Sequence, residues 1–239
     1  MNLSHFTSAK SMPEFVGTTV LDTIGLVIAN VDDALLKKMN YDKSYRSIGL
    51  FSSRTGAAGQ ILAIDEAIKA TNCEVLCIDL PRDTKGWGGH GNFIVVGSRN
   101  VADARRCIEI ALEKTTLHAG EVYISEAGHL EFAFSAKAGA ALQMGFKAPL
   151  DRAFGFICGS PAAIGLLISD MALKTSNVEV IQYLTPSIGT SHSNEVIITI
   201  TGDTVAVKEA VILARTNGLL LLEAMGSKAL SPTGRPYIS

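Results

Sequence analysis

The chain has 239 residues and a formal net charge of −2, and hydrophobic residues make up 47% of it. This length suits one large domain or two of ordinary size, and the apolar content can fill their cores. The near-neutral charge provides no broad basic field, which argues against a nucleic-acid partner. No secretory signal is visible at the N-terminus and no apolar run could span a bilayer, so we expect a cytoplasmic protein without a membrane partner.

The first half of the chain alternates β-rich and helical patterns. Residues 1–15 are polar and are expected to form a flexible tail. Two acids begin the segment 32–39 and two lysines end it, which favours a helix in that direction. Apolar residues at helical spacing follow Thr55, which we expect to be an N-cap. The expected elements are strand 23–31, helix 32–39, strand 47–53, helix 55–71, strand 73–80, strand 92–98 and a helix from 101.

The second half repeats the first at a spacing of about 106 residues. The segment 128–144 resembles 22–38, and the second copy of the helix after Thr55 begins near residue 161. Because strands are separated by helices in some places and by short loops in others, we expect an α+β fold. The predicted domains are 16–118 and 119–239.

A pair of charged residues recurs in the repeat. Asp65 and Lys69 lie four residues apart on one predicted helix, and Asp170 and Lys174 stand at the matching positions of the other. Such a pair is weakly stabilising on a helix surface, and its recurrence hints at a second role.

Local motifs for metal, cofactor or nucleophilic chemistry are missing. The four cysteines, of which Cys73 and Cys77 lie in an apolar strand, form no C-x-x-C pair and have no histidine at zinc-ligand spacing. Gly86 to Gly91 fits G-x-G-x-x-G, but a strand follows it where a dinucleotide motif needs a helix. We therefore expect no metal, no cofactor and no catalytic residue.

Two polar loops stand at matching places in the repeat, at 82–92 and 186–194. His90 and His192 lie in them, and catalytic use would need a carboxylate and a nucleophile nearby; only Asp83, Ser191 and Ser193 offer these by residue type. Polar residues in such loops are more often solvated turn residues. A third reading is that loops from several copies surround a narrow aqueous hole that admits hydrogen-bonding solutes.

Polar residues also recur near the junction of the two halves. Glu126 and His129 stand there in the second half, and Asp22 has the corresponding place in the first. These side chains could contact a small ligand in a channel between the halves, or serve only as caps and turn contacts.

Longer segments carry a family resemblance. The stretches EFVGTTVLDTIGLVIANVD, YRSIGLFSSRTGA, LPRDTKGWGGHG and TPSIGTSHSNE resemble tandem-domain bacterial microcompartment shell proteins, of the B type found in propanediol- and ethanol-utilisation compartments. The resemblance covers about residues 13–238. It implies two circularly permuted domains, each an antiparallel sheet flanked by helices, in a protein of the compartment shell.

The resemblance also implies an assembly and roles for named residues. Three chains would form a pseudohexagonal plate, and plates would tile beside other shell proteins. The D-x-x-x-K-x-x-N motif, which lies at the plate edge in the family, maps onto Asp65, Lys69 and Asn72 and onto Asp170, Lys174 and Asn177. The residues expected to line a central pore are Lys85, Gly86, Trp87, Gly88, Gly89, His90, Ser187, Ile188, Gly189, Thr190, Ser191 and His192.

Small polar metabolites such as glycerol, propanediol or ethanol would cross these pores, and the tail could bind encapsulated enzymes.

Two departures from the family stand out. Ser98 and Thr201 replace an edge arginine, and Trp87 could narrow or plug the central opening. The rival hypotheses are a trimeric regulator with a ligand between its domains, and an enzyme that uses His90 or His192.

Overall fold

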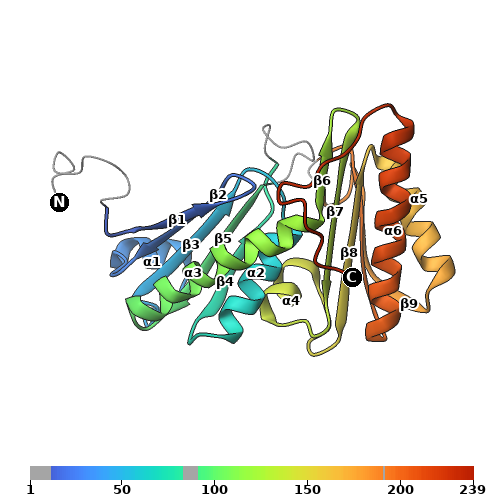
Figure 1. The fold of residues 1–239 in the computed structure, drawn as a ribbon. Coiled ribbons are helices and arrows are strands. Elements are labelled where there is room, and N and C mark those ends of the chain that lie inside the picture. The colour runs from blue at the N-terminus through green and yellow to red at the C-terminus, as the bar shows by residue number, and fades with distance from the viewer. Residues whose placement is uncertain (1–11, 83–90, 191) are drawn as a thin grey trace.

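The computed structural model describes residues 12–82, 91–190 and 192–239, which form two similar halves side by side (Figure 1). Each half contains one five-stranded sheet, and all of its strand pairs are antiparallel. The strand order is β1-β2-β3-β5-β4 in the first half and β6-β7-β8-β10-β9 in the second. The two orders are the same, so the sequence repeat is a repeat of fold, and the expected α+β class is confirmed.

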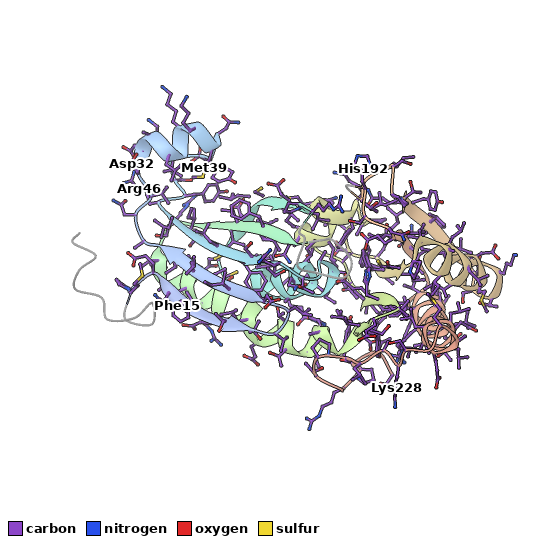
Figure 2. All side chains as sticks on the ribbon, turned by 90° about the horizontal axis from the view of Figure 1, so that it is seen from above. Phe15, Asp32, Met39, Arg46, His192 and Lys228 are labelled. Atoms are coloured by element: carbon purple, nitrogen blue, oxygen red, sulfur yellow. The ribbon has the colours of Figure 1, made fainter. Side chains whose placement is uncertain are left out.

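The first half consists of the following elements, given in chain order. They are β1 (Phe15–Thr19), β2 (Thr23–Ile28), α1 (Asp33–Met39), β3 (Ser47–Ser53), α2 (Ala58–Lys69), β4 (Glu74–Asp79), β5 (Asn92–Ser98) and α3 (Val101–His118). Asp32 accepts hydrogen bonds from the backbone N–H groups of Ala34 and Leu35 and so caps α1. Helix α1 lies at the end of the molecule, away from the second half (Figure 2).

The second half repeats this order of elements. After a 3₁₀ turn (Ala119–Glu121) come β6 (Val122–Ser125), β7 (Gly128–Ser135), α4 (Ala140–Phe146), β8 (Ala153–Ser160), α5 (Ala162–Thr175), β9 (Val178–Leu184), β10 (Val196–Gly202) and α6 (Thr204–Ala224). Helices α5 and α6 cover the face of this sheet that is turned away from the first half (Figure 1).

The two halves share one hydrophobic core. Helix α2 contacts β7 and α4, so it lies between its own sheet and that of the second half. Ile61 and Leu62 of α2 belong to one buried cluster with Leu142 and Phe146 of α4 and Phe156 of β8. Removing this apolar surface from water stabilises the arrangement of the halves as well as each half.

The C-terminal segment returns to the junction of the halves. Leu230 pairs with Ile124 of β6, and the Tyr237 hydroxyl donates to the Phe134 carbonyl oxygen. The backbone N–H of Ile238 donates to the buried carboxylate of Glu121, to which Arg215 also donates. These contacts attach the last residues to the second sheet.

Three local expectations were incomplete or wrong. Strands β1 and β6 were not predicted, since they are short and are held by pairing to β2 and β7. Thr55 does not cap α2, because Gly56 turns the chain at φ +79° and the helix begins only at Ala58. The Thr55 hydroxyl instead donates to Asp22.

Candidate functional site

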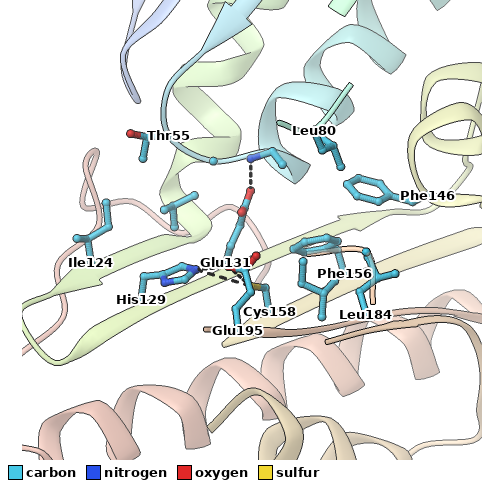
Figure 3. A pocket seen from close by; sticks show the side chains of 15 residues that line it. Thr55, Leu80, Ile124, His129, Glu131, Phe146, Phe156, Cys158, Leu184 and Glu195 are labelled. Atoms are coloured by element: carbon cyan, nitrogen blue, oxygen red, sulfur yellow. Dashed lines mark hydrogen bonds and ion pairs between the residues drawn. The ribbon is translucent and has the colours of Figure 1, made fainter. Parts of the chain in front are cut away.

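A small cavity lies where the N-terminus of α2 meets the second sheet (Figure 3). Its volume is about 30 Å³, which is enough for roughly two water molecules. Both halves contribute to its wall, and so does Gly189 of the loop 186–194. The lining residues are Thr55, Gly56, Ala57, Leu80, Val122, Ile124, His129, Glu131, Phe146, Phe156, Cys158, Leu184, Gly189, Glu195 and Ile197.

Glu131 joins the two halves at this cavity. Its Oε1 accepts hydrogen bonds from the backbone N–H groups of Ala57 at 3.0 Å and Ala58 at 2.7 Å. These are donors at the start of α2, which has no side-chain cap of its own. A carboxylate at a helix N-terminus also interacts favourably with the helix dipole. Glu131 therefore caps a helix of the other half from the middle of β7.

Three further polar side chains meet beside Glu131. His129 of β7, Cys158 of β8 and Glu195, just before β10, are all buried. Nε2 of His129 lies 3.1 Å from Oε2 of Glu195, and Sγ of Cys158 lies 3.7 Å from each of these atoms. Burial raises the pKa of the Cys158 thiol, and the carboxylates of Glu195 and Glu131 raise this pKa further.

The residues predicted for a channel between the halves are only partly brought together. His129 lines the cavity, whereas Glu126 is exposed in the turn between β6 and β7. Asp22 accepts from Thr55, which lines the cavity. A ligand channel at these three residues stays a prediction.

Of the predicted pore-lining residues, 85–90 and Ser191 lie outside the described residues. Ser187, Ile188 and Gly189 are exposed in a tight turn after β9, which Thr185 and Ile188 close with two backbone hydrogen bonds. Thr190 is buried and donates to the Thr185 carbonyl oxygen, whereas His192 is exposed. Residues 187–190 of this second loop thus form a turn that exposes Ser187, Ile188 and Gly189 and buries Thr190.

The two copies of the predicted edge motif have different surroundings. Asp65 is fully buried, so the expectation of a surface pair with Lys69 was wrong. Asp65 accepts from the backbone N–H groups of Gly139, Ala141 and Leu142, at the start of α4 in the other half. Lys69 pairs with Asp65 at 2.7 Å and also donates to the Lys137 carbonyl oxygen.

The second copy of the motif is open to solvent. Asp170 and Lys174 pair with each other at 2.7 Å on the outer surface of α5. The side chain of Lys174 is 72% exposed, compared with 42% for Lys69. Asn72 donates to Asp103, and Asn177 precedes β9.

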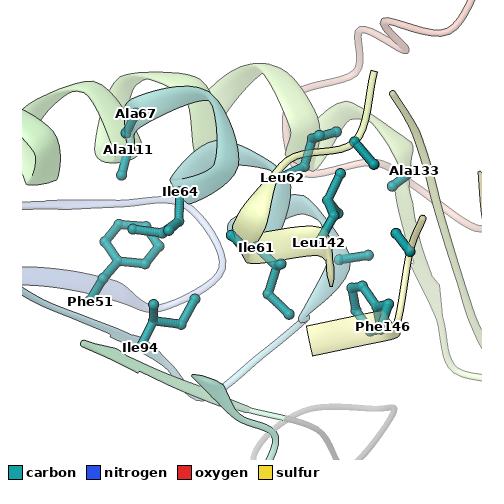
Figure 4. Packing of buried hydrophobic residues seen from close by; sticks show 14 of the residues in the cluster. Phe51, Ile61, Leu62, Ile64, Ala67, Ile94, Ala111, Ala133, Leu142 and Phe146 are labelled. Atoms are coloured by element: carbon teal, nitrogen blue, oxygen red, sulfur yellow. The ribbon is translucent and has the colours of Figure 1, made fainter. Parts of the chain in front are cut away.

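Large apolar side chains are exposed at the two ends of the molecule. On α5, Leu166 and Leu167 are 51% and 45% exposed, and they occupy the positions that Ile61 and Leu62 have on α2. At the other end, Leu35 is the third residue of α1 and is 46% exposed. Its counterpart in α4, Leu142, is buried against α2 (Figure 4).

The outer face of the first sheet follows the same rule. Phe93 is the second residue of β5 and is 40% exposed, whereas the second residue of β10, Ile197, is buried in the junction cluster. These three surfaces, which are covered inside the chain, thus have uncovered copies at the ends of the molecule.

Sequence reasoning missed most of the cavity. Glu131, Cys158 and Glu195 belong to different segments, so no local spacing connects them. The repeat contains one usable signal. Glu131 is a charged residue on an expected strand, and the first half has the apolar Ile24 near the corresponding place. None of the helices that the structure describes is long and apolar enough to cross a bilayer.

The fold and the junction define a protein of two tandem α+β domains, and comparison with known proteins identifies it further. Residues 153–227 match the model of the BMC domain. The chain is 53% identical over 218 residues to the bacterial microcompartment shell protein PduB of Citrobacter freundii, covering 91% of this chain and 81% of that protein. The chain belongs to this family of bacterial microcompartment shell proteins, and its fold is two permuted BMC domains in tandem.

Two solved structures have the same fold over nearly the whole chain. A trimeric bacterial microcompartment shell protein PduB superposes with a TM-score of 0.90 at 47% identity, covering 95% of this chain and 100% of that one. EtuB from Clostridium kluyveri superposes with a TM-score of 0.91 at 48% identity, covering 95% and 99%.

Proposed function

We propose that three copies of this shell protein close head to tail into a ring of six domains, which forms a flat plate of the shell. The observation that carries the proposal is the pair of uncovered apolar surfaces. Helix α5 exposes leucines where α2 buries its apolar side chains, and α1 exposes Leu35 where α4 is covered. These surfaces lie at opposite ends of the molecule, and joining them in neighbouring copies would repeat the internal junction (Figure 1).

Ring closure is the expected result of such a contact. Two different surfaces that join head to tail give a closed ring when the rotation between the copies closes. Because each junction relates neighbouring, similar domains, three chains with two domains each approximate sixfold symmetry. The solved PduB homologue is described as trimeric, which supports this number.

We infer that the plate is structural and passes small polar molecules, without a catalytic step. The relatives are named as shell proteins. In the turn 187–190, Ser187 and Gly189 are exposed and suit a narrow polar opening, since they hydrogen-bond to solutes without bulk, whereas the exposed Ile188 adds an apolar side chain. Glycerol, propanediol and ethanol are the solutes we propose for the pores, and other shell proteins and enclosed enzymes are the proposed partners.

The proposed channel within each subunit carries a condition. Its residues would be Asp22, Glu126 and His129, but the cavity beside His129 has room for about two waters. A polyol would pass only if the turn at Gly189 or the start of α2 moved aside.

The assembly test uses one substitution on α5. Leu166→Asp places a charge where the proposed junction is apolar, and an unpaired buried charge is strongly unfavourable. We expect the solution mass to fall from three times 25.3 kDa to 25.3 kDa, measured by light scattering coupled to size exclusion.

A matched control exists on α6. Leu220 is 59% exposed, and its counterpart on α3, Leu117, is exposed as well, so the internal junction predicts no contact there. Leu220→Asp should keep the wild-type mass. A trimer that survives Leu166→Asp, with folding verified by circular dichroism, would contradict the proposed junction.

A further inference from the structure

The buried cluster of His129, Cys158 and Glu195 has an arrangement that its role as a structural contact does not require. His129 on β7, Cys158 on β8 and Glu195 just before β10 supply an imidazole nitrogen, a thiol sulfur and a carboxylate oxygen, and these atoms all lie within 4.8 Å of one another. Borderline-soft divalent cations prefer this combination of donors. The cation site would be enclosed by one chain (Figure 3).

The distances correspond to one face of a tetrahedron. Zinc bonds of about 2.0–2.1 Å to nitrogen and oxygen and about 2.3 Å to sulfur give an N···O edge of about 3.3 Å and edges to sulfur of about 3.6 Å. The observed edges are 3.1 Å between His129 and Glu195 and 3.7 Å from Cys158 to each of them. A cation would therefore fit with shifts of a few tenths of an ångström, which rotamer adjustments can supply.

From this geometry we propose that His129, Cys158 and Glu195 bind one Zn²⁺ ion per chain, with a water as the fourth ligand. Glu131 is not counted as a ligand, because its Oε1 already accepts from the start of α2. The adjoining cavity of about 30 Å³ has room for that water. Three protein ligands and one open position are typical of zinc sites that exchange their fourth ligand.

The proposed site is electrically neutral when it is filled. Zn²⁺ with a neutral imidazole, a thiolate and a carboxylate sums to zero, and the proton that the thiol loses on binding goes to solvent. The filled site thus leaves no uncompensated charge in a buried region, where such a charge is expensive.

The first half lacks this cluster. At the place of His129 it has Asp22, and the strands that correspond to β7 and β8 carry Ile24 and Ser52 near the place of Glu131 and Cys158. The site would consequently belong to the junction within each chain and not to the junction between chains. It does not depend on the proposed trimer, so the two proposals can fail separately.

Cobalt titration of the purified, metal-free full chain tests the site. Co²⁺ replaces Zn²⁺ in tetrahedral sites, and a thiolate ligand adds a charge-transfer band in the near ultraviolet to the visible d–d bands. We expect one equivalent of Co²⁺ to produce both sets of bands, and Zn²⁺ to abolish them by displacement. Zinc content per chain, measured by mass spectrometry after zinc loading, should also be one.

Variants identify the ligands and exclude a surface cysteine. Cys158→Ser should remove the charge-transfer band, and His129→Gln should weaken binding at least about 100-fold, since even loss of an indirect contact costs about 10–100-fold. Cys77→Ser is the control, because Cys77 is half-buried, lies beside Asp79 and stands outside the cluster. It should keep the bands.

Two results would overturn the proposal. One is a wild-type chain that gives no charge-transfer band with Co²⁺, in which case the cluster is a hydrogen-bonded pair of His129 and Glu195 with a neighbouring thiol. The other is a band that persists in Cys158→Ser. Glu195→Gln keeps the side-chain shape and decides the case if Cys158→Ser fails to fold; it should also weaken cobalt binding at least about 10-fold.

Discussion

Asp65 and Asp170 occupy the same position of one repeated motif, yet they differ in what they contact. Helix α4 begins after Gly139, which has no side chain, and Asp65 supplies the missing acceptor from another helix. Helix α1 begins after Asp32, which caps the helix itself. The start of α4 therefore needs the carboxylate of Asp65, whereas the start of α1 is already capped by Asp32 and does not need Asp170.

This difference predicts unequal effects of the same substitution. Asp65→Ala leaves three N–H groups of α4 without their acceptor and Lys69 without its partner, so we expect a loss of about 3 kcal/mol in the free energy of unfolding. Asp170→Ala removes only an exposed pair and should cost less than about 1 kcal/mol. Urea unfolding of both variants measures this, and equal losses would contradict the capping role of Asp65.

At the scale of elements, α2 and α3 are joined by a polar contact at one end of their interface. Glu66 of α2 accepts from Nζ of Lys114 at 3.2 Å and lies 2.9 Å from Nε2 of His118, both on α3. The hydrogen bond from His118 lowers the pKa of the Glu66 carboxyl below its usual value, and the charges of His118 and Lys114 contribute in the same direction.

The lowered pKa predicts how acid affects this pair of helices. A carboxyl that is more acidic in the folded state stabilises the fold above its unfolded pKa of about 4.5, and this stabilisation is lost as pH falls through the lower, folded value. At pH 6 the free energy of unfolding of the wild type should exceed that of Glu66→Gln by at most about 1 kcal/mol. The difference is limited because the Glu66 side chain is one-third exposed and solvent screens its charge.

Unfolding midpoints of the two proteins between pH 6 and about pH 3 measure the effect, and the gap should shrink on acidification. Glu113→Gln, at an exposed position of α3, controls for the change in net charge. A gap that stays constant down to the lowest pH would contradict an ionised Glu66 as its source.

Elements whose signals are local could be predicted from the sequence. The two acids at the start of α1 and the apolar spacing of α2 are contained in a few neighbouring residues. Strand β6 could not be predicted, because its four residues gain their structure from pairing with β7. The cap of α2 comes from Glu131, which lies 73 residues after Ala58 in the sequence. No local pattern can encode a partner so distant.

At the scale of the whole molecule, the fused repeat gives a ring two kinds of junction. At the junction inside each chain, Glu131 accepts hydrogen bonds from the start of α2. The cluster of His129, Cys158 and Glu195 lies beside it. The proposed junction between chains pairs α5 with α1. There the start of α5 follows Pro161, which has no N–H, and the Ala162 N–H donates to Asn194 instead. At the start of α5, the Ala162 N–H thus has its acceptor within the same chain.

The edge of the plate provides the last prediction. Resemblance to the family assigns Lys69 and Lys174 to contacts between plates, and Lys174 is the more exposed of the two. Lys69 also balances the buried charge of Asp65, so Lys69→Ala changes the junction as well as the edge. Lys174→Ala is therefore the cleaner test, because its partner Asp170 is already exposed to solvent.

We expect Lys174→Ala to keep the mass of the trimer and its unfolding midpoint, but to give fewer and smaller sheets in electron micrographs. Each plate would repeat the lost contact three times, so a small change per contact accumulates along an edge. Lys228→Ala, at an exposed position that follows α6, controls for loss of a surface charge. Sheets of wild-type extent from Lys174→Ala trimers would show that plates tile through other residues.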